Sequence, residues 1–330
     1  MTEVRKRVLT AHILGEDGKR MLSERTDVEL VEFQNTISKH DFLELLNSFD
    51  AVHGVILGLT PFGAAELDAA RGLKVVSRIG VGYDAVDIPT MSAAGIPVMV
   101  CADANHRPVA EHTLAFMLSL AKKSDTLTRL VKDGRWQERY QYLPVELDGK
   151  SVLVVGCGRI GSRVVELCLA FGMQVNVYDP CLTASSIPPG AHQIASLDDA
   201  LPTIDFLTLH CPRTPETLGL IGRERLERLK PGACLINTAR GGIVDEQALV
   251  ERLRDGHLAG AALDVFMPEP PPSELDLAAL PNLLCSPHLA GVSREAVSRM
   301  AVLAAGNVID VFDGRPNARN AINAQELGLA

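Results

Sequence analysis

A glycine-rich turn directly after a short apolar run constrains the fold of this chain more than any other stretch. Residues 151–161 read Ser-Val-Leu-Val-Val-Gly-Cys-Gly-Arg-Ile-Gly. This spacing is typical of a buried parallel strand that turns into a helix around a pyrophosphate. Gly156 permits the tight turn, Gly158 lets the backbone approach the phosphates, and Gly161 lets the helix pack close to the strand. The N–H groups at that helix N-terminus would face the diphosphate.

A carboxylate follows the next apolar run. The helical stretch Arg159 to Phe171 leads to a strand at Gln174 to Tyr178, which ends at Asp179. A dinucleotide site places a carboxylate about 20 residues past the glycines, where it accepts hydrogen bonds from the adenosine ribose. Its negative charge would repel a 2′-phosphate, and the next three residues supply no cation. The sequence therefore predicts NAD rather than NADP, and the alternative for Asp179 is a solvated strand end.

The composition excludes several function classes. The 330 residues are 47% hydrophobic and 22% charged, which is ordinary usage for a globular chain long enough for two domains. The formal net charge of −9 argues against a nucleic-acid or anionic-membrane partner. No apolar run approaches the ~18 residues of a membrane span, and residues 8–14 are typical of a first strand rather than a signal peptide. The scattered cysteines favour a reducing cytoplasmic location, and we expect no metal site.

Alternating strand and helix patterns divide the chain into two parallel α/β layers. The first layer takes its strands from residues 8–14, 28–33, 52–57, 73–79 and 96–100. After a linker at 102–108, a long helical pattern at 109–130 precedes the strands of the second layer, at 151–155, 174–178, 206–210, 234–238, 259–265 and 283–286. The helical pattern at 293–312 is expected to pack back on the first layer. We predict two doubly wound parallel-sheet domains, a Rossmann NAD-binding domain (103–292) inserted in a flavodoxin-like substrate domain (1–102 and 293–330).

Charged side chains follow the last three strands. Arg240 follows the strand at 234–238, Asp264 and then Glu269 follow the next, and His288 follows the last. Because ligands lie beyond the carboxyl ends of strands in an open parallel sheet, we expect these side chains to converge. A lone charged residue in a loop is usually solvated surface, but successive strand ends bring these four together.

This set of side chains suits hydride transfer between a nicotinamide and a carbonyl. His288 can give a proton to the carbonyl oxygen and reclaim it in the reverse reaction. The Glu269 carboxylate would stabilise the imidazolium. Arg240 can hold a carboxylate bidentately and polarise the carbonyl. Asp264 is placed to anchor the nicotinamide end of the cofactor.

Other polar positions have two interpretations each. The glycines at Gly80 and Gly82 can make consecutive N–H groups point at one spot, a nest for a carboxylate, or can simply form a tight turn. Arg78 beside them can hold a phosphate or a second carboxylate, or bridge groups at the surface. His112 is interpreted as a packed helix histidine rather than a ligand. Trp136, the only tryptophan, lies in an irregular stretch and has no assigned role.

Several of these motifs resemble those of the D-isomer-specific 2-hydroxyacid dehydrogenases, and the resemblance covers nearly the whole chain. Residues 154–161 resemble the cofactor loop of that family, and residues 236–246 resemble the segment with its substrate arginine, here Arg240. Residues 262–270 resemble the segment with Asp264 and Glu269, and residues 286–291 the segment with the acid–base histidine, here His288. Residues 80–84 resemble the carboxylate-binding loop, and residues 210–212 the loop at the adenine pocket.

The resemblance implies an NAD-dependent oxidoreductase acting on a small anionic 2-oxo or D-2-hydroxy acid of the glyoxylate, hydroxypyruvate or 3-phosphoglycerate class. It also implies a two-domain subunit that closes over the substrate, a helix following Asn105 between the domains, and a homodimer formed largely by the cofactor domain. The predicted cofactor contacts are Gly156, Gly158, Arg159, Ile160, Gly161, Asp179, His210, Cys211, Pro212, Thr217, Thr238, Ala239, Asp264, His288 and Gly291. The predicted substrate contacts are Arg78, Val81, Gly82, Arg240 and His288, and the catalytic residues are Arg240, Glu269 and His288.

Two other functions stay open at this point. Some relatives are NAD(H)-sensing corepressors that keep the same residues but act by oligomerising and binding peptides. A hydrolase that uses bound NAD internally is a third possibility. The substrate side chain and the physiological direction are left undetermined by the sequence.

Overall fold

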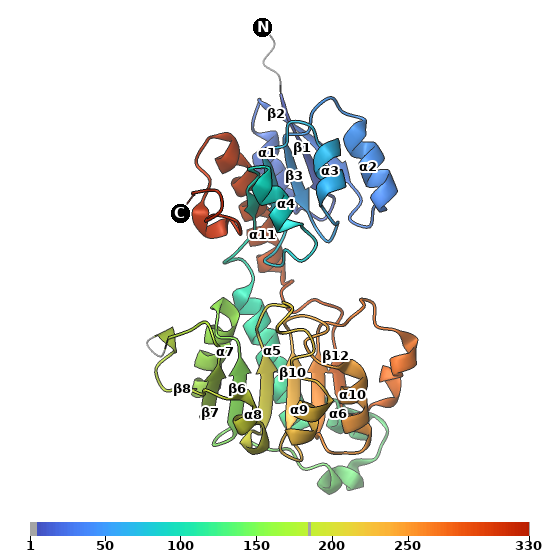
Figure 1. The fold of residues 1–330 in the computed structure, drawn as a ribbon. Coiled ribbons are helices and arrows are strands. Elements are labelled where there is room, and N and C mark those ends of the chain that lie inside the picture. The colour runs from blue at the N-terminus through green and yellow to red at the C-terminus, as the bar shows by residue number, and fades with distance from the viewer. Residues whose placement is uncertain (1–4, 184–185, 330) are drawn as a thin grey trace. The chain divides into compact units, whose positions relative to one another are not determined.

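The computed structural model describes residues 5–183 and 186–329, which divide into two compact units. Of the described residues, unit 1 comprises 5–105 and 292–329, and unit 2 comprises 106–183 and 186–291. In each unit the named strands pair parallel and helices cover both faces of the sheet, which makes both units doubly wound α/β folds (Figure 1). Among the described helices, none has the length and apolar character needed to cross a membrane.

Unit 1 contains a five-stranded sheet in the order β2-β1-β3-β4-β5, which is the flavodoxin-like order. The strands are β1 (Lys6–Ala11), β2 (Val28–Phe33), β3 (Gly54–Leu57), β4 (Val75–Arg78) and β5 (Val98–Met99). The helices are α1 (Glu16–Ser23), α2 (Lys39–Asn47), α3 (Ala64–Ala69), α4 (Ile88–Ala93), α11 (Arg294–Phe312) and the 3₁₀ turn η6 (Ala318–Asn320).

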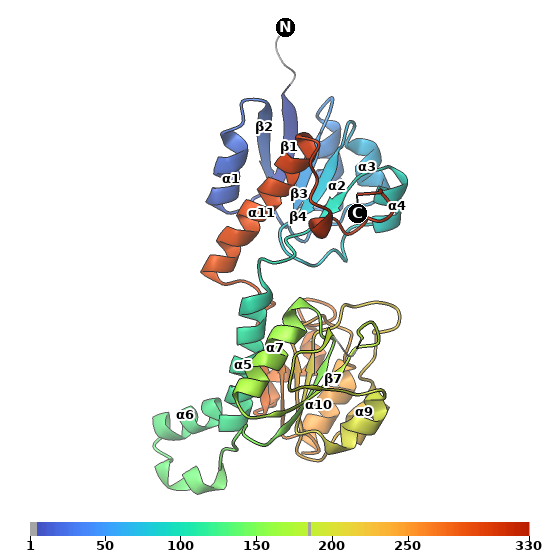
Figure 2. The same cartoon turned by 90° about the vertical axis from the view of Figure 1, so that its left-hand side faces the viewer.

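The helix α11 returns to unit 1 and completes its core. It lies beside α1, and both helices pack on one face of the sheet (Figure 2). A Cβ atom at Gly18 would lie 2.5 Å from the carbonyl oxygen of Ala301, so only glycine permits this approach of the two helices. Ser77 of β4 donates to the carbonyl oxygen of Ala304 at 3.0 Å. The core of unit 1 is therefore built from two segments far apart in the sequence.

Unit 2 contains a seven-stranded sheet in the order β12-β11-β10-β9-β6-β7-β8, the Rossmann order extended by one strand. The strands are β6 (Ser151–Val155), β7 (Gln174–Tyr178), β8 (His192–Gln193), β9 (Phe206–Leu209), β10 (Cys234–Asn237), β11 (Gly260–Leu263) and β12 (Leu283–Cys285). The helices are α5 (His106–Lys122), α6 (Ser124–Lys132), α7 (Arg159–Ala170), α8 (Leu197–Ala200), α9 (Arg223–Arg228) and α10 (Glu246–Arg254), with 3₁₀ turns η1 (Trp136–Gln141), η3 (Leu201–Thr203), η4 (Ser273–Leu275) and η5 (Leu277–Ala279).

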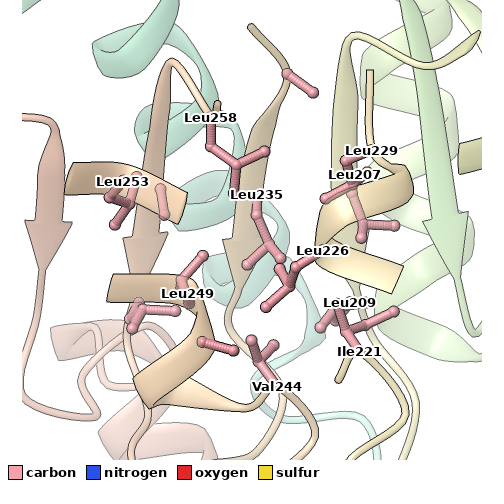
Figure 3. Packing of buried hydrophobic residues seen from close by; sticks show 14 of the residues in the cluster. Leu207, Leu209, Ile221, Leu226, Leu229, Leu235, Val244, Leu249, Leu253 and Leu258 are labelled. Carbon is pink, nitrogen blue, oxygen red and sulfur yellow. The ribbon is translucent and has the colours of Figure 1, made fainter. Parts of the chain in front are cut away.

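Two apolar clusters cover the faces of this sheet. Helices α5 and α7 pack on one face, and α9 and α10 pack on the other. Figure 3 shows the second cluster, in which Leu235 of β10 lies between Leu226 of α9 and Leu249 of α10. The central strands β6, β9, β10 and β11 contain no charged residue, so the charged side chains of the site lie beyond the strand ends.

The long helix expected at 109–130 is wrong, because two helices occupy this stretch. The backbone of Lys123 is left-handed, with φ of 51°, and separates α5 from α6. The carbonyl oxygen of Ala121 accepts from the backbone N–H of Val145 at 2.9 Å instead of from the next helical turn, and Lys122 donates to the carbonyl of Val145. This tertiary contact ends α5, while the apolar periodicity continues on both sides of the break.

Candidate active site

The glycine turn between β6 and α7 has the geometry of a phosphate cradle. The backbone of Gly156 has φ of 88°, and a Cβ atom there would lie 2.7 Å from the backbone nitrogen of Cys211. A Cβ atom at Gly161 would lie 2.0 Å from the carbonyl oxygen of Gly156, so α7 crosses close to the strand. A Cβ atom at Gly158 would meet nothing within 4 Å. Protein backbone thus packs tightly against Gly156 and Gly161, whereas the space beside Gly158 at the α7 N-terminus is open. This open space fits a diphosphate group.

Asp179 joins the glycine turn to the end of β7. Its Oδ2 accepts from the backbone N–H of Cys157 at 2.8 Å, and its Oδ1 accepts from the N–H of Cys181 at 2.9 Å. A carboxylate has about four acceptor positions, so these two bonds leave capacity for ribose hydroxyls. The half-buried Asp179 both shapes the turn and presents a negative charge beside it.

The loop after β9 closes the other side of the cradle. His210 contacts Thr208 through Nε2, 2.9 Å from the threonine oxygen, and burial lowers the pKa of His210 to about 3. Burial also raises the pKa of the Cys211 thiol to about 11. The Thr217 hydroxyl donates to the carbonyl oxygen of Pro212 at 2.6 Å and so holds the loop in shape. Near neutral pH this wall of the cradle carries no charge from His210 or Cys211.

Strand register brings the predicted catalytic loops to one edge of the sheet. Asn237 at the end of β10 pairs with Leu263 of β11, and Leu263 pairs with Cys285 of β12. Adjacent strands lie ~4.8 Å apart, so the ends of β10 and β12 are roughly 10 Å apart. The loops that carry Arg240, Asp264 and His288 therefore start side by side.

The loop after β10 is folded by Asn237. Its amide nitrogen donates to the carbonyl oxygen of Arg240 at 2.9 Å, and its side-chain oxygen accepts from the N–H of Ala239 at 3.0 Å. The Thr238 hydroxyl meets the Thr113 hydroxyl of α5 at 2.8 Å, and both side chains are buried. The half-buried Arg240 is thus carried on a turn anchored to the sheet and to α5.

The side chains of His288 and Glu269 are hydrogen-bonded to each other. Nδ1 of His288 lies 2.7 Å from Oε2 of Glu269, and the side chains are 40% and 35% exposed. The carboxylate only accepts hydrogen bonds, so Nδ1 carries a proton and Nε2 is left to exchange one. Oε1 of Glu269 accepts from the N–H of Phe266 at 3.1 Å, which holds the carboxylate in place.

Asp264 builds the turn that carries His288. Its Oδ1 accepts from the N–H of Leu289 at 2.8 Å, its Oδ2 accepts from the N–H of Ala290 at 3.0 Å, and the Ser286 hydroxyl donates to Oδ1. The N–H of His288 donates to the backbone carbonyl of Asp264 at 2.8 Å. His288 has φ of 55°, a left-handed conformation that costs a non-glycine residue about 1 kcal/mol. The buried Asp264 offsets that cost with these bonds.

One pocket of about 610 Å³ adjoins the His288–Glu269 pair. Asp264, Glu269, Ser286 and His288 line it, together with apolar side chains such as Pro270 and Leu277. The remaining cofactor predictions, Arg159, Ile160 and Gly291, lie in the first turn of α7 and at the end of unit 2.

Ser286 and His112 form a hydrogen-bonded chain to Asp264, near His288, that the sequence did not indicate. Nε2 of His112 on α5 lies 3.0 Å from Oγ of Ser286, and the His112 ring packs edge-on against Phe116 at 4.4 Å. Ser286 gives its proton to Asp264, so His112 donates to Ser286. The Ser-Pro-His motif could have indicated Ser286, whereas the contact of His112 depends on how α5 crosses the sheet.

The remaining predicted substrate residues belong to unit 1. Arg78 is buried, and its Nε donates to the carbonyl oxygen of Gly82 at 2.9 Å, so the interpretation of Arg78 as a surface bridge is wrong. Gly80 has φ of 126°, and its carbonyl oxygen accepts from the N–H of Cys101 at 2.8 Å. Val81 and Gly82 are half-buried in this loop. The Arg78 side chain thus stabilises the turn that contains Gly80 and Gly82. The sequence indicated the two glycines of this turn but not its bond to Arg78.

Comparison with known proteins matches the segment that contains the glycine turn to one protein family. Residues 114–290 match the family described as D-isomer specific 2-hydroxyacid dehydrogenase, NAD binding domain. The chain belongs to the D-isomer specific 2-hydroxyacid dehydrogenases. Unit 2 therefore contains the NAD-binding domain of this family, and the cofactor is NAD.

Individual 2-hydroxyacid dehydrogenases and their structural neighbours agree with this assignment. D-3-phosphoglycerate dehydrogenase from Archaeoglobus fulgidus is 37% identical over 297 residues, 90% of this chain and 56% of that protein. The chain thus spans little more than half the length of this relative. The crystal structure of TT0316 protein from Thermus thermophilus is 36% identical with a TM-score of 0.86, covering 96% of this chain and 99% of that one. D-lactate dehydrogenase from Aquifex aeolicus, complexed with NAD and lactic acid, is 27% identical with a TM-score of 0.83, covering 96% and 98%.

The glycine turn of unit 2 allows stability and cofactor binding to be separated. Gly158→Ala places a Cβ atom in open space, so we expect an unchanged unfolding midpoint but at least roughly tenfold weaker NADH binding, because the methyl group occupies the phosphate side. Gly161→Ala places its Cβ atom against a backbone carbonyl and should lower both stability and affinity. NADH fluorescence titration and thermal unfolding measure the two effects. Equal NADH affinity of Gly158→Ala and the parent chain would contradict the assignment of this turn.

His210 makes the stability of the folded chain sensitive to acid. Its pKa is about 3 in the folded chain and ~6.5 when unfolded, so the unfolded state binds the proton first as the pH falls. Stability from this group is complete above pH ~6.5 and declines below it, by on the order of 2 kcal/mol at pH 5. His210→Gln should reduce the difference in unfolding free energy between pH 8 and pH 5 by about that amount. Urea unfolding at both pH values measures it, with the exposed His40→Gln as control.

Proposed function

We propose that this chain is an NAD-linked dehydrogenase that transfers a hydride between the nicotinamide and a small 2-oxo or D-2-hydroxy acid. The observation that carries the proposal is the His288–Glu269 pair, hydrogen-bonded at 2.7 Å beyond the carboxyl end of β12. Family membership and the name D-3-phosphoglycerate dehydrogenase of the relatives at 37% identity support the same chemistry. We propose 3-phosphoglycerate and its 2-oxo product as the first substrates to test, followed by glyoxylate and hydroxypyruvate.

In this proposal His288 is the general acid and base. Nδ1 keeps its proton toward Glu269, and Nε2 gives a proton to the carbonyl oxygen during reduction and takes it back during oxidation. The negative charge of Glu269 stabilises the imidazolium that reduction requires. NADH, when bound, supplies the hydride that the carbonyl carbon accepts, and the product carries one hydride and one proton more than the 2-oxo acid.

Arg240 is proposed to bind the carboxylate of the substrate. A guanidinium offers paired donors that match a carboxylate, and the neutral Asn237 amide that shapes its loop adds no competing charge. Asp179, beside the glycine turn, supports NAD over NADP because a 2′-phosphate would lie near its carboxylate. We further propose unit 2 as the cofactor domain and unit 1 as the substrate domain, with Arg78, Val81 and Gly82 in a carboxylate-binding loop.

Turnover by variants tests the assignment. We expect oxidation of NADH with at least one of the 2-oxo acids, and His288→Asn should lower kcat roughly a hundredfold or more while NADH affinity stays within about threefold. Glu269→Gln should lower kcat less than His288→Asn, since the proton donor remains. Undiminished turnover of His288→Asn would refute the mechanism, and comparable kcat/KM with NADPH would refute the role of Asp179. NADH-dependent assembly without turnover would instead favour an NAD-sensing binding protein.

We also propose that two copies of the chain form a homodimer through unit 2. The segment of α6 and η1 extends from the sheet of this unit, and it exposes Trp136 at 56% and Tyr140 at 70% (Figure 2). Val131, Leu143 and Val145 on the same segment are exposed as well. Five large apolar side chains within 15 residues are thus exposed, and apolar groups exposed together on one segment are typical of a protein interface.

The dimer proposal predicts that Trp136→Ser combined with Tyr140→Ser shifts the chain from dimer to monomer in sedimentation equilibrium. The exposed Leu59→Ser in unit 1 removes a comparable apolar group elsewhere and should leave the dimer intact. A parent chain that sediments as a monomer at micromolar concentration would contradict the proposal.

A further inference from the structure

A second glutamate lies beside the acid–base pair. Helix α10 begins at Glu246, and the preceding Asp245 caps the helix by accepting from the N–H of Ala248 at 3.0 Å. The side chain of Glu246 is half-buried and turns to another loop instead. Its Oε1 accepts from the backbone N–H of Met267 at 2.9 Å. Glu246 thus connects the start of α10 to the loop after β11.

Consecutive backbone amides hold two carboxylates next to each other. The N–H of Phe266 donates to Glu269, and the N–H of Met267 donates to Glu246. Glu269 in turn bonds to Nδ1 of His288 through its other oxygen. A displacement of residues 266–267 would therefore move the carboxylate that orients the histidine.

The same glutamate lies at the loop that carries Arg240. Glu246 follows the loop of Arg240 along the chain, at the point where that loop enters α10. The loops after β10 and β11 are in tight contact here, because a Cβ atom at Gly241 would lie 1.9 Å from the carbonyl oxygen of Phe266. Because Glu246 belongs to the segment that leaves β10 and accepts from the N–H of Met267 in the loop after β11, its hydrogen bond helps to hold the two loops together.

We propose that Glu246 is a positioning residue that locks the Arg240 loop to the Glu269 loop and adds a negative charge behind the Glu269–His288 pair. This inference rests on the proposed function, in which Arg240, Glu269 and His288 act on one 2-oxo acid. Glu246 itself needs no contact with the substrate. Its effect passes through Glu269, which sets the orientation of His288 and stabilises the protonated ring.

The charges around Glu246 determine whether Glu246 favours the protonated or the neutral form of His288. Burial is the main cause that raises the pKa of Glu246 from its ordinary value. The negative charges of Glu269 and Asp245 also raise this pKa, while backbone hydrogen bonding lowers it. Above that pKa Glu246 is anionic and favours the imidazolium form of His288. The charged and titratable groups that face this region are Asp245 at the cap of α10, Glu269 and His288 in the loops after β11 and β12, Arg213 against Met267, and Arg223 of α9 near Asp245.

Two variants separate the positioning from the charge. Glu246→Gln removes the charge but keeps an oxygen that accepts from the N–H of Met267. Glu246→Ala removes both. Glu251→Gln is the matched control, because Glu251 lies on the same helix but is exposed and pairs with Arg223.

For Glu246→Ala we expect kcat to fall about tenfold, the effect of one charge-assisted hydrogen bond, with KM for NADH within about twofold. For Glu246→Gln we expect a smaller loss of kcat and a shift of the alkaline limb of the pH–kcat profile to lower pH by about half a unit, because the imidazolium loses a stabilising charge. Glu251→Gln should leave the profile unchanged. An unchanged profile and kcat in both Glu246 variants would overturn the proposal, as would losses that follow only the thermal midpoint.

A measurement without turnover distinguishes this inference from the proposed function. The titration of the His288 ring can be followed by ¹⁵N NMR of the histidine side chains, with His288→Asn to assign its signals. Glu246→Gln should move the titration midpoint of His288 to lower pH, whether or not a substrate has been found. If the midpoint moves and no 2-oxo acid is reduced, the proposed function fails and the charge role of Glu246 stands. If turnover is present and the midpoint does not move, the charge role of Glu246 fails.

Discussion

The parallel register of β10, β11 and β12 is the constraint on which the candidate site depends. Asn237, Leu263 and Cys285 lie side by side at the ends of these strands, so three separate loops begin at one edge of the sheet. Apolar residues on both faces of the strands exclude charged groups from the middle of the sheet. The charged side chains of the candidate site in unit 2 consequently lie in the loops that follow these strands.

Carboxylates that bind backbone amides give this edge its shape. Asp179 binds the N–H of Cys157 in the glycine turn, Asp264 binds the turn around His288, and Glu246 binds the N–H of Met267. In each case a negative charge is held by fixed N–H groups and still has acceptor capacity left. The same bonds that order the loops therefore also place charge around the site, which is why the loops can be rigid without regular secondary structure.

The predictions from the sequence agree best with the structure where the local backbone conformation requires one residue type. The roles of Gly156 and Gly161 follow from backbone conformation and from a close approach that excludes any Cβ atom, and both are visible in the spacing of the motif. The break at Lys123 was not visible, because the contact that ends α5 comes from Val145, far along the chain. Asp264 was placed at the right strand end, but its bonds to Leu289 and Ala290 give it a structural task that the sequence did not indicate.

By itself the sequence determined the two α/β layers, the dinucleotide turn and the family, because these depend on local periodicity and on glycines whose backbone conformations admit few substitutes. The tertiary structure decided which side chains meet: His288 with Glu269, His112 with Ser286, and Glu246 with the loop after β11. These pairs join segments that are distant along the chain. Their contacts depend on strand register and on the path of each loop, neither of which is encoded in the spacing of neighbouring residues.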